Sequence, residues 1–285
     1  MPPINAKTGV CAVIGHPIGH SMSPQLHNAA FDFLGLPMVY VAHDVNPGEV
    51  ARALDGIRVL GYRGLSVTIP HKVEAMHAVD EVDETARGIG CINTVVNESG
   101  RLLGYNSDGR GALNALREAG ADPAGRRVLL LGSGGAARAI GITLVREAPP
   151  AELTILGVVP EELARLVQDA RDRGKSPVRG EPLSDAALSG AMSDADIVLH
   201  CTPLGMHPNE DNTIVPASLW KPGTTVFDAV YNPRRTRLLK EAEAAGCRIV
   251  EGIEMFLGQA YVQFELWTGQ PAPRDVMRRV LEERL

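Results

Sequence analysis

Short apolar runs alternate with amphipathic stretches along almost the whole chain. Apolar runs without polar alternation are typical of strands that are buried on both faces. We predict strands at residues 10–14, 38–42, 65–69, 128–131, 152–156, 196–200, 225–229 and 248–250, and a hairpin formed by residues 92–96 and 102–105. Because helical segments separate most of these strands, the pattern predicts an α/β fold with largely parallel sheets.

The stretches between the strands have apolar residues three and four positions apart, as amphipathic helices do. We predict helices at residues 24–34, 47–60, 73–79, 83–88, 109–119, 135–147, 160–173, 235–245, 252–267 and 274–285. In the first helix, Leu26, Ala30 and Phe33 should share one buried side. Ser23 before Pro24, Asn46 before Pro47, and Asp108 are expected to be N-caps.

The most informative pattern is the strand at 128–131, which runs directly into a glycine-rich turn and an alanine-rich helix. The turn has the spacing G-x-G-x-x-A, in the strand–turn–helix context of a dinucleotide-binding fingerprint. Gly132 permits the tight turn, Gly134 lets the backbone approach a pyrophosphate, and Ala137 allows close helix packing. An ordinary tight turn is the alternative, but the strand at 152–156 completes a βαβ unit and favours dinucleotide binding.

Composition narrows the class of protein. The 285 residues suffice for two domains, and 45% hydrophobic with 22% charged residues is typical of a globular protein in water. A net charge of −6 without a basic block argues against nucleic acid as a partner. No apolar run reaches the roughly 20 residues that span a bilayer, and the first residues lack a signal-peptide pattern.

The cysteines and histidines indicate neither disulfides nor a metal. Cys11, Cys91, Cys201 and Cys247 form no C-x-x-C pair, and the histidines lack metal-ligand spacing. Reduced thiols in apolar segments, together with the missing signal-peptide pattern, predict a cytoplasmic protein without a metal.

Three polar segments near predicted strand ends could bind a ligand. Ser21 and Ser23 place two hydroxyls beside a helix N-terminus, which suits a carboxylate. Thr68 and Lys72 follow a strand's carboxyl end, the edge at which open α/β sheets bind ligands. Asp108 begins a helix. Each has a simpler explanation: capping for Ser23 and Asp108, and a solvated surface charge for Lys72.

Taken in order, these segments resemble the motifs of the shikimate dehydrogenase family almost from end to end of the chain. The matching segments are His20-Ser21-Met22-Ser23-Pro24, Ser66-Val67-Thr68-Ile69-Pro70-His71-Lys72, Cys91-Ile92-Asn93-Thr94, Asn106-Ser107-Asp108-Gly109, residues 132–138, Thr202-Pro203-Leu204-Gly205-Met206, residues 228–236 and residues 252–260. Ser66 replaces the family's usual Asn. Chance does not explain so many matches in the same order.

The resemblance implies an oxidoreductase that reversibly reduces 3-dehydroshikimate to shikimate, in the route to chorismate and the aromatic amino acids. It implies Lys72 and Asp108 as the catalytic pair. The implied substrate-binding residues are Ser21, Ser23, Thr68, Asn93, Tyr231 and Gln259. The implied cofactor-binding residues are Gly132, Ser133, Gly134, Gly135, Ala136, Thr202, Met206 and Gly252.

Hydride arriving at a carbonyl carbon leaves charge on the oxygen, which requires a proton donor or another stabilising charge. An ammonium group such as that of Lys72 can act in either way, and both remain open. His71 is adjacent, but its side chain is expected to point away from that of Lys72 and to be structural.

NADP is the cofactor that the resemblance implies, with NAD as the alternative. Gly157-Val158-Val159 stands where NADP-using members of the family have Asn-Arg-Thr, so the usual 2′-phosphate clamp is absent. The acid that selects NAD is absent as well, because Glu152 lies at the beginning of its strand. Glu161 is expected to be a helix-start charge. We therefore expect weak discrimination between the cofactors. His200 also departs from the family, which often has Asn there.

The resemblance implies two domains: a substrate-binding and catalytic domain of residues 1–107 and 252–285, and a Rossmann-like domain of residues 108–251. The expected partners are a small-molecule substrate and, at most, a second copy, since monomer and homodimer both remain open. Two other functions also remain: a dehydrogenase acting on quinate or an aminated analogue with NAD, and a catalytically silent sensor of a shikimate-like ligand.

Overall fold

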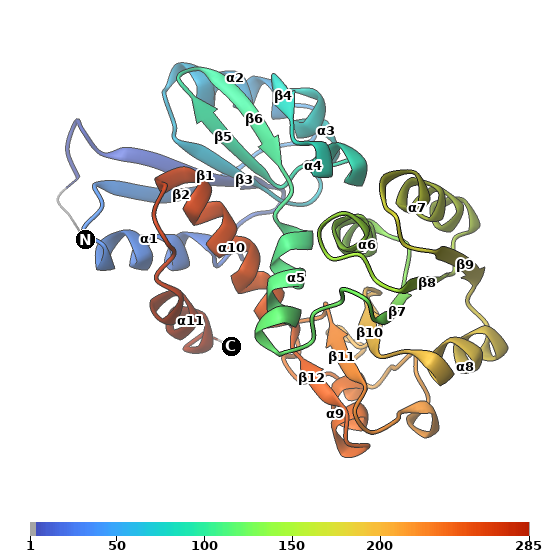
Figure 1. Cartoon of the computed structure of the whole chain (residues 1–285). Coiled ribbons are helices and arrows are strands. Elements are labelled where there is room, and N and C mark those ends of the chain that lie inside the picture. The colour runs from blue at the N-terminus through green and yellow to red at the C-terminus, as the bar shows by residue number, and fades with distance from the viewer. Residues whose placement is uncertain (1–3, 285) are drawn as a thin grey trace. The chain divides into compact units, whose positions relative to one another are not determined.

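The computed structural model describes residues 4–284, and the chain divides into two compact units (Figure 1). Unit 1 comprises Met1–Ser107 and Gln259–Leu285, and unit 2 comprises Asp108–Gly258. The second change of unit lies inside one helix, α10 (Gly252–Thr268). Each unit is built on its own six-stranded sheet. No helix in the described part of the chain is long and apolar enough to cross a membrane.

Unit 1 has a mixed sheet with the strand order β2-β1-β3-β5-β6-β4. The strands are β1 (Gly9–Gly15), β2 (Met38–Asp44), β3 (Gly64–Val67), β4 (Glu81–Val82), β5 (Thr94–Glu98) and β6 (Arg101–Tyr105). The helices are α1 (Ser23–Phe33), α2 (Val50–Val59), α3 (Lys72–His77), α4 (Glu84–Ile89) and α11 (Arg274–Glu282). β1 pairs in parallel with β2 and β3, whereas the predicted hairpin β5–β6 is antiparallel. β4 was not predicted, since two residues give no periodicity.

Unit 2 has a sheet in which every strand pair is parallel. Its strands are β7 (Arg127–Leu131), β8 (Glu152–Gly157), β9 (Val178–Pro182), β10 (Ile197–His200), β11 (Thr225–Asp228) and β12 (Arg248–Val250). Its helices are α5 (Asp108–Glu118), α6 (Gly135–Glu147), α7 (Pro160–Arg173), α8 (Asp185–Asp194), a short 3₁₀ helix (Ala217–Leu219), α9 (Arg237–Ala244) and the first part of α10. The strand order β9-β8-β7-β10-β11-β12 is that of a Rossmann fold.

The helices of unit 2 cover both faces of its sheet. Alternate strand residues such as Leu129 and Val198 pack with Leu188 of α8 and Leu238 of α9. On the opposite face α6 approaches so closely that a Cβ at Gly141 would lie 3.2 Å from Leu130 Cδ2. The continuous apolar runs that predicted these strands follow from burial on both faces.

Three predicted helix starts are wrong. α1 begins at Ser23, so Met22 occupies the N-cap position and no side chain caps the helix. The Ser23 hydroxyl instead interacts with the phenol of the buried Tyr40 and counteracts part of the rise in its pKa. α2 begins only at Val50, after a turn that contains Asn46, and α5 begins at Asp108 itself.

The predicted buried face of α1 is also partly wrong. Phe33 is 65% exposed, whereas His27 and Phe31 are fully buried. The His27 ring stacks on Tyr40 at a centroid distance of 4.6 Å and lies 5.2 Å from the ring of Trp267. This aromatic cluster, which includes the last turn of α10, turns the helix away from the face that its apolar residues suggest.

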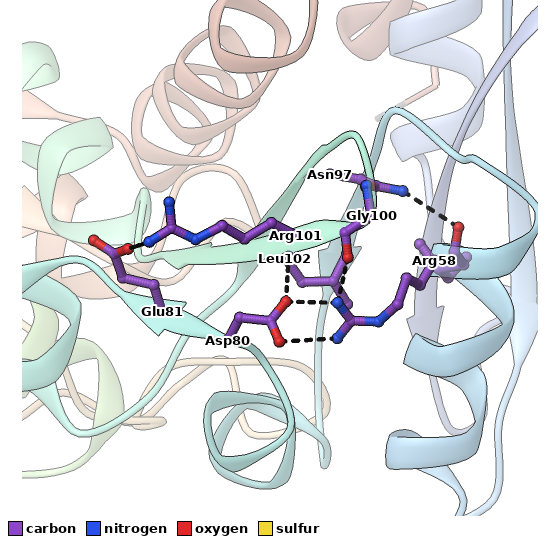
Figure 2. A network of polar contacts seen from close by, with 8 residues as sticks. Arg58, Asp80, Glu81, Asn97, Gly100, Arg101 and Leu102 are labelled. Atoms are coloured by element: carbon purple, nitrogen blue, oxygen red, sulfur yellow. Dashed lines mark hydrogen bonds and ion pairs between the residues drawn. The ribbon is translucent and has the colours of Figure 1, made fainter.

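An ionic network holds the β5–β6 hairpin against α2 (Figure 2). Arg58 donates to both carboxylate oxygens of Asp80, at 2.6 and 3.2 Å, and also to the carbonyl of Gly100 in the hairpin turn. The same carboxylate accepts from the backbone N–H of Leu102 at 2.7 Å. These hydrogen bonds lower the pKa of Asp80, and the one from Arg58 has the largest effect. The hairpin is therefore tied to α2 by these side-chain hydrogen bonds, in addition to the pairing of β5 with β3 in the sheet.

Glycines in helices permit close packing at some positions and are unconstrained at others. A Cβ at Gly109 in α5 would lie 2.0 Å from Thr143 Oγ1 and 2.3 Å from the carbonyl oxygen of Ala139, both in α6. We expect Gly109→Ala to lower the free energy of unfolding by about 1–3 kcal/mol, because α5 and α6 must separate.

Gly56 in α2 is the matched control for this prediction, since nothing lies within 4 Å of a Cβ there. Gly56→Ala should be neutral or stabilise by up to about 1 kcal/mol, because alanine loses less backbone entropy in a helix. Urea unfolding of both variants measures the difference. Equal effects would contradict the close approach of α5 to α6.

Burial of His27 should make the stability of unit 1 depend on pH. Burial lowers the pKa of His27 from 6.5 to about 3, so between these values the unfolded chain binds more protons than the folded one. The free energy of unfolding therefore falls as the pH is lowered through this window, by up to about 1.4 kcal/mol per pH unit. We expect His27→Phe to remove this part of the slope in urea unfolding between pH 7 and 4.5. His77→Gln, at an exposed position, should keep it.

Candidate active site

In unit 1, the segments that follow β1 and β3 meet at one edge of the sheet. The Thr68 backbone N–H donates to the carbonyl of Ile14 at 3.0 Å, and that of His16 donates to the carbonyl of Ile69 at 3.1 Å. A Cβ at Gly15 would lie 2.6 Å from Thr68 Cγ2. The close approach at Gly15 therefore places Thr68 directly against the end of β1.

Lys72 and Asn93 belong to the same edge. The backbone N–H of Ile92 donates to the carbonyl of Lys72 at 3.1 Å, and that of Val67 donates to the carbonyl of Asn93 at 2.8 Å. Lys72 is half-buried as the first residue of α3, and Asn93 is buried. His71 points elsewhere: it is buried, and its Nε2 lies 2.8 Å from the carbonyl oxygen of Val45, which agrees with a structural role.

A chain of buried hydrogen bonds leads from the core of unit 1 to Asn93. Tyr40 Oη donates to Ser66 Oγ at 2.6 Å, and Ser66 Oγ donates to Gln263 Oε1 at 2.9 Å. Gln263 Nε2 donates to Thr94 Oγ1 at 3.1 Å, and Thr94 Oγ1 donates to Asn93 Oδ1 at 2.7 Å. Each member has a partner, so the chain holds the amide of Asn93 in one orientation.

Sequence analysis missed Tyr40 and Gln263 as parts of this arrangement. Gln263 is a polar residue within the apolar helix α10, and it is only 2% exposed. A buried amide must find hydrogen-bond partners, so its position among apolar residues was the available signal. Burial raises the pKa of Tyr40 well above its usual value, so the phenol remains a donor.

Ser21 and Ser23 adjoin this network at the start of α1. Both are half-buried, and the Ser23 backbone N–H donates to Ser21 Oγ at 3.4 Å. Ser23 also interacts with the phenol of Tyr40, which donates to Ser66 at the beginning of the chain that ends at Asn93. The structure thus gathers five predicted site residues of unit 1 around one sheet edge: Ser21, Ser23, Thr68, Lys72 and Asn93.

In unit 2, the glycine turn lies where the strand order reverses, between β7 and β10. Gly132 has a φ of +113°, and a Cβ there would lie 2.8 Å from the carbonyl oxygen of Cys201, so a larger residue does not fit. Gly134 is the N-cap of α6, and no side chain caps this helix. Gly134 and Gly135 are exposed. The first N–H groups of α6 can therefore receive a pyrophosphate, as the fingerprint predicts.

The other predicted residues of unit 2 lie in or near the segments that follow β10 and β11. Met206 is 47% exposed in the loop after β10, and Tyr231 is 45% exposed after β11, with its ring 5.6 Å from that of Phe256. A Cβ at Gly252 would lie 2.5 Å from the carbonyl oxygen of Val230, so this glycine lets α10 begin against the β11 segment. Two further predicted residues lie elsewhere: Asp108 starts α5 in unit 2, and Gln259, half-buried in α10, belongs to unit 1.

The strand end that should select between NAD and NADP has an unusual surface. Val158 is 75% and Val159 43% exposed immediately after β8. Glu161 and Glu162 follow in the first turn of α7, where carboxylates complement the helix dipole. Glu152 pairs with Arg179 at 2.9 Å at the opposite end of β8, as its position in the strand predicted. Neither a 2′-phosphate clamp nor a ribose-binding acid stands directly after the strand.

No group of three histidine, cysteine or acidic side chains within residues 4–284 could hold a metal ion. All four cysteines are free, and burial raises the pKa of Cys11, Cys201 and Cys247. These three are therefore protonated thiols at neutral pH.

The strand order and glycine turn of unit 2 define a Rossmann-type dinucleotide-binding domain. Two family models match the chain: the shikimate dehydrogenase substrate binding domain over residues 13–95, and the shikimate 5′-dehydrogenase C-terminal domain over residues 252–282.

Individual relatives extend the match over nearly the whole chain. A shikimate dehydrogenase (NADP(+)) of Moorella thermoacetica is 44% identical over 282 residues, which cover 99% of this chain and 95% of the relative. The structure of the Listeria monocytogenes enzyme with shikimate and NAD has a TM-score of 0.95 at 34% identity and covers 99% of both chains. That of the Thermus thermophilus enzyme with NADP(H) and shikimate has a TM-score of 0.85 at 33% identity and covers 97% of this chain and 100% of the other. The chain belongs to the shikimate dehydrogenase family.

Proposed function

We propose that the chain catalyses the reversible reduction of 3-dehydroshikimate to shikimate with a nicotinamide dinucleotide. The strongest structural support is the edge of unit 1 at which backbone hydrogen bonds hold Thr68, Lys72 and Asn93 together. Hydroxyl, amide and ammonium groups at one sheet edge suit a small polyhydroxylated acid. Relatives named as shikimate dehydrogenases over the same length support this substrate class.

The roles that we propose for unit 1 follow from the chemistry of its side chains. Ser21 and Ser23 bind the substrate carboxylate through their hydroxyls at the beginning of α1. Thr68 and Asn93 bind ring hydroxyls, for which the buried network pre-orients the Asn93 amide. Lys72 provides the positive charge, and either a proton or an electrostatic contact, at the carbonyl oxygen. Gln259 of unit 1 and Tyr231 of unit 2 complete the proposed substrate-binding set, and Asp108 of unit 2 is the second proposed catalytic group.

The roles that we propose for unit 2 concern the cofactor. A bound nicotinamide dinucleotide supplies or accepts the hydride. The amides of the Gly132–Ala136 turn and the first turn of α6 bind the pyrophosphate, and the absence of a side-chain cap at Gly134 suits this role. The loop with Thr202 and Met206, together with Gly252, borders the nicotinamide half. We also propose a cytoplasmic location, which the free cysteines support. Monomer and homodimer both remain possible assemblies.

Replacement of Lys72 tests the proposed reaction. We expect Lys72→Ala to lower kcat by about 10²–10⁴-fold in shikimate oxidation, because a positioned acid–base group contributes on that order. The dissociation constant for shikimate should change much less, since hydroxyl and amide groups provide most of the binding. Steady-state kinetics and calorimetric titration with shikimate measure the two quantities.

Lys175→Ala, at an exposed position in unit 2, is the control and should turn over like the parent. A parent chain that binds shikimate without turnover would instead support the sensor hypothesis. Quinate, assayed in parallel, distinguishes the other alternative: a higher kcat/KM with quinate than with shikimate would contradict the proposed substrate.

Cofactor choice is the second test. We propose NADP as the cofactor, with NAD also accepted, because Val158 and Val159 offer no positive charge to a 2′-phosphate. The ratio of kcat/KM for NADP to that for NAD should remain below a hundredfold, a difference of about 2.7 kcal/mol. Val158→Arg should raise the ratio by about tenfold, since a guanidinium binds phosphate through charged hydrogen bonds. Val158→Gln controls for polarity, and an equal effect would contradict the charge argument.

A further inference from the structure

A buried aspartate–histidine–threonine arrangement lies at the ends of β10 and β11 in unit 2. His200 is the last residue of β10, and Asp228 is the last residue of β11. His200 Nδ1 lies 2.8 Å from Asp228 Oδ1, and His200 Nε2 lies 2.5 Å from Thr202 Oγ1. The side chains of His200 and Asp228 are 1% and 0% exposed. The function argued above uses Thr202 but assigns nothing to His200 or Asp228.

Asp228 is held in place by further donors. Its Oδ1 accepts from the backbone N–H of Val230 at 3.0 Å, and its Oδ2 accepts from Thr236 Oγ1 at 2.6 Å. Thr236 is also the N-cap of α9. A buried carboxylate is costly unless hydrogen bonds compensate it. Here the donors come from the last residue of β10, from the segment that follows β11 and from the N-cap residue of α9. The carboxylate is therefore a rigid anchor for the His200 ring.

The anchor determines which way the hydrogen bonds run. Asp228 accepts at His200 Nδ1, so in the neutral ring the proton stays on Nδ1 and Nε2 is an acceptor. The Thr202 hydroxyl must then donate its hydrogen to Nε2. Its oxygen also accepts from the backbone N–H of Leu204 at 3.3 Å. Toward a ligand, Thr202 thus presents an oxygen lone pair rather than a hydrogen.

The position of Thr202 indicates what that oxygen could meet. A Cβ at Gly132 would lie 3.3 Å from Thr202 Cγ2, so the side chain adjoins the first glycine of the fingerprint. In the Rossmann strand order, the adenosine half of the dinucleotide lies over β7–β9, and its ribose, at which NAD and NADP are distinguished, lies next to β8. The nicotinamide half lies over β10–β12. Thr202 follows β10 and therefore lies on the nicotinamide side.

We propose that His200 is a positioning residue: anchored by Asp228, it holds the Thr202 hydroxyl as a hydrogen-bond acceptor for the nicotinamide half of the dinucleotide. The donors in that half are the carboxamide N–H groups and the ribose hydroxyls. The inference rests on the proposed function, because it requires a nicotinamide cofactor. It adds His200 and Asp228 as two residues that affect the reaction by positioning Thr202.

Two replacements of His200 separate the two hydrogen bonds of the ring. The amide of Asn reaches the region of Nδ1, so His200→Asn keeps a donor for Asp228 and loses the contact with Thr202. The amide of Gln reaches the region of Nε2, so His200→Gln keeps that contact. We expect His200→Asn and Thr202→Val each to raise the KM for the cofactor by about tenfold, the size of one hydrogen bond. The KM for shikimate should stay constant, and His200→Gln should remain within about threefold of the parent.

The double variant His200→Asn/Thr202→Val tests whether the two residues act as one unit. Its cofactor KM should equal that of Thr202→Val alone, because without the hydroxyl nothing remains for His200 to orient. Additive increases would overturn the proposal. Thr213→Val is the control, since this hydroxyl, in the same connection between β10 and β11, donates to the nearby carbonyl of Val215 at 3.4 Å and has no other hydrogen bond within residues 4–284.

The 3-acetylpyridine analogue of the cofactor, which lacks the carboxamide N–H groups, distinguishes the two donors. A parent preference for the natural cofactor that disappears in Thr202→Val assigns the carboxamide, and an unchanged preference with a raised KM assigns the ribose. An unchanged KM in Thr202→Val, which keeps the buried His200–Asp228 pair, would refute the proposal even if His200→Asn fails to fold. If the parent protein shows no turnover, the proposed function is refuted instead. Calorimetric titration of the parent and the variants with NADP would still test whether His200 positions Thr202 for cofactor binding.

Discussion

Burial of polar side chains at strand ends is the constraint on which both units depend. A polar group without a partner in the interior is costly, so each such group must be paired, and pairing leads from one residue to the next. In unit 1 the sequence of hydrogen bonds runs from Tyr40 to Asn93, and in unit 2 it runs from Thr236 to Thr202. Both begin in the core and end at a residue near the edge where ligands are expected. Rigid polar residues at that edge are the result.

A second constraint, the close approach of neighbouring segments, explains the glycines at two strand ends. Gly15 and Gly132 each end a strand and lie against a neighbouring segment, so a Cβ at either would collide with it. These close contacts join the loops after adjacent strands into one layer. The residues that the loops display are then held at defined positions by the two sheets rather than by flexible connections.

The cofactor end of unit 2 shows how much can change without altering the fold. Val158 and Val159 point outward after β8, where neither packing nor backbone geometry requires a particular side chain. Substitution at such positions alters the charge offered to a ligand at little cost in stability. His200 is the opposite case, since it is buried and hydrogen-bonded on both ring nitrogens, so a change there alters the loop that it supports.

The class of fold, the order of most elements and the family could be predicted from the residues alone. Apolar runs, glycine turns and motif spacing are local patterns, and a parallel sheet buried on both faces makes them continuous enough to recognise. Short or polar elements such as β4 and β9 left no such pattern. Which polar groups pair with one another depends instead on how the elements pack in three dimensions. Gln263 meets Ser66, and His200 meets Asp228, across long separations in the chain. Such pairs form because burial forces a partner on each group, and no local pattern specifies which partner that is.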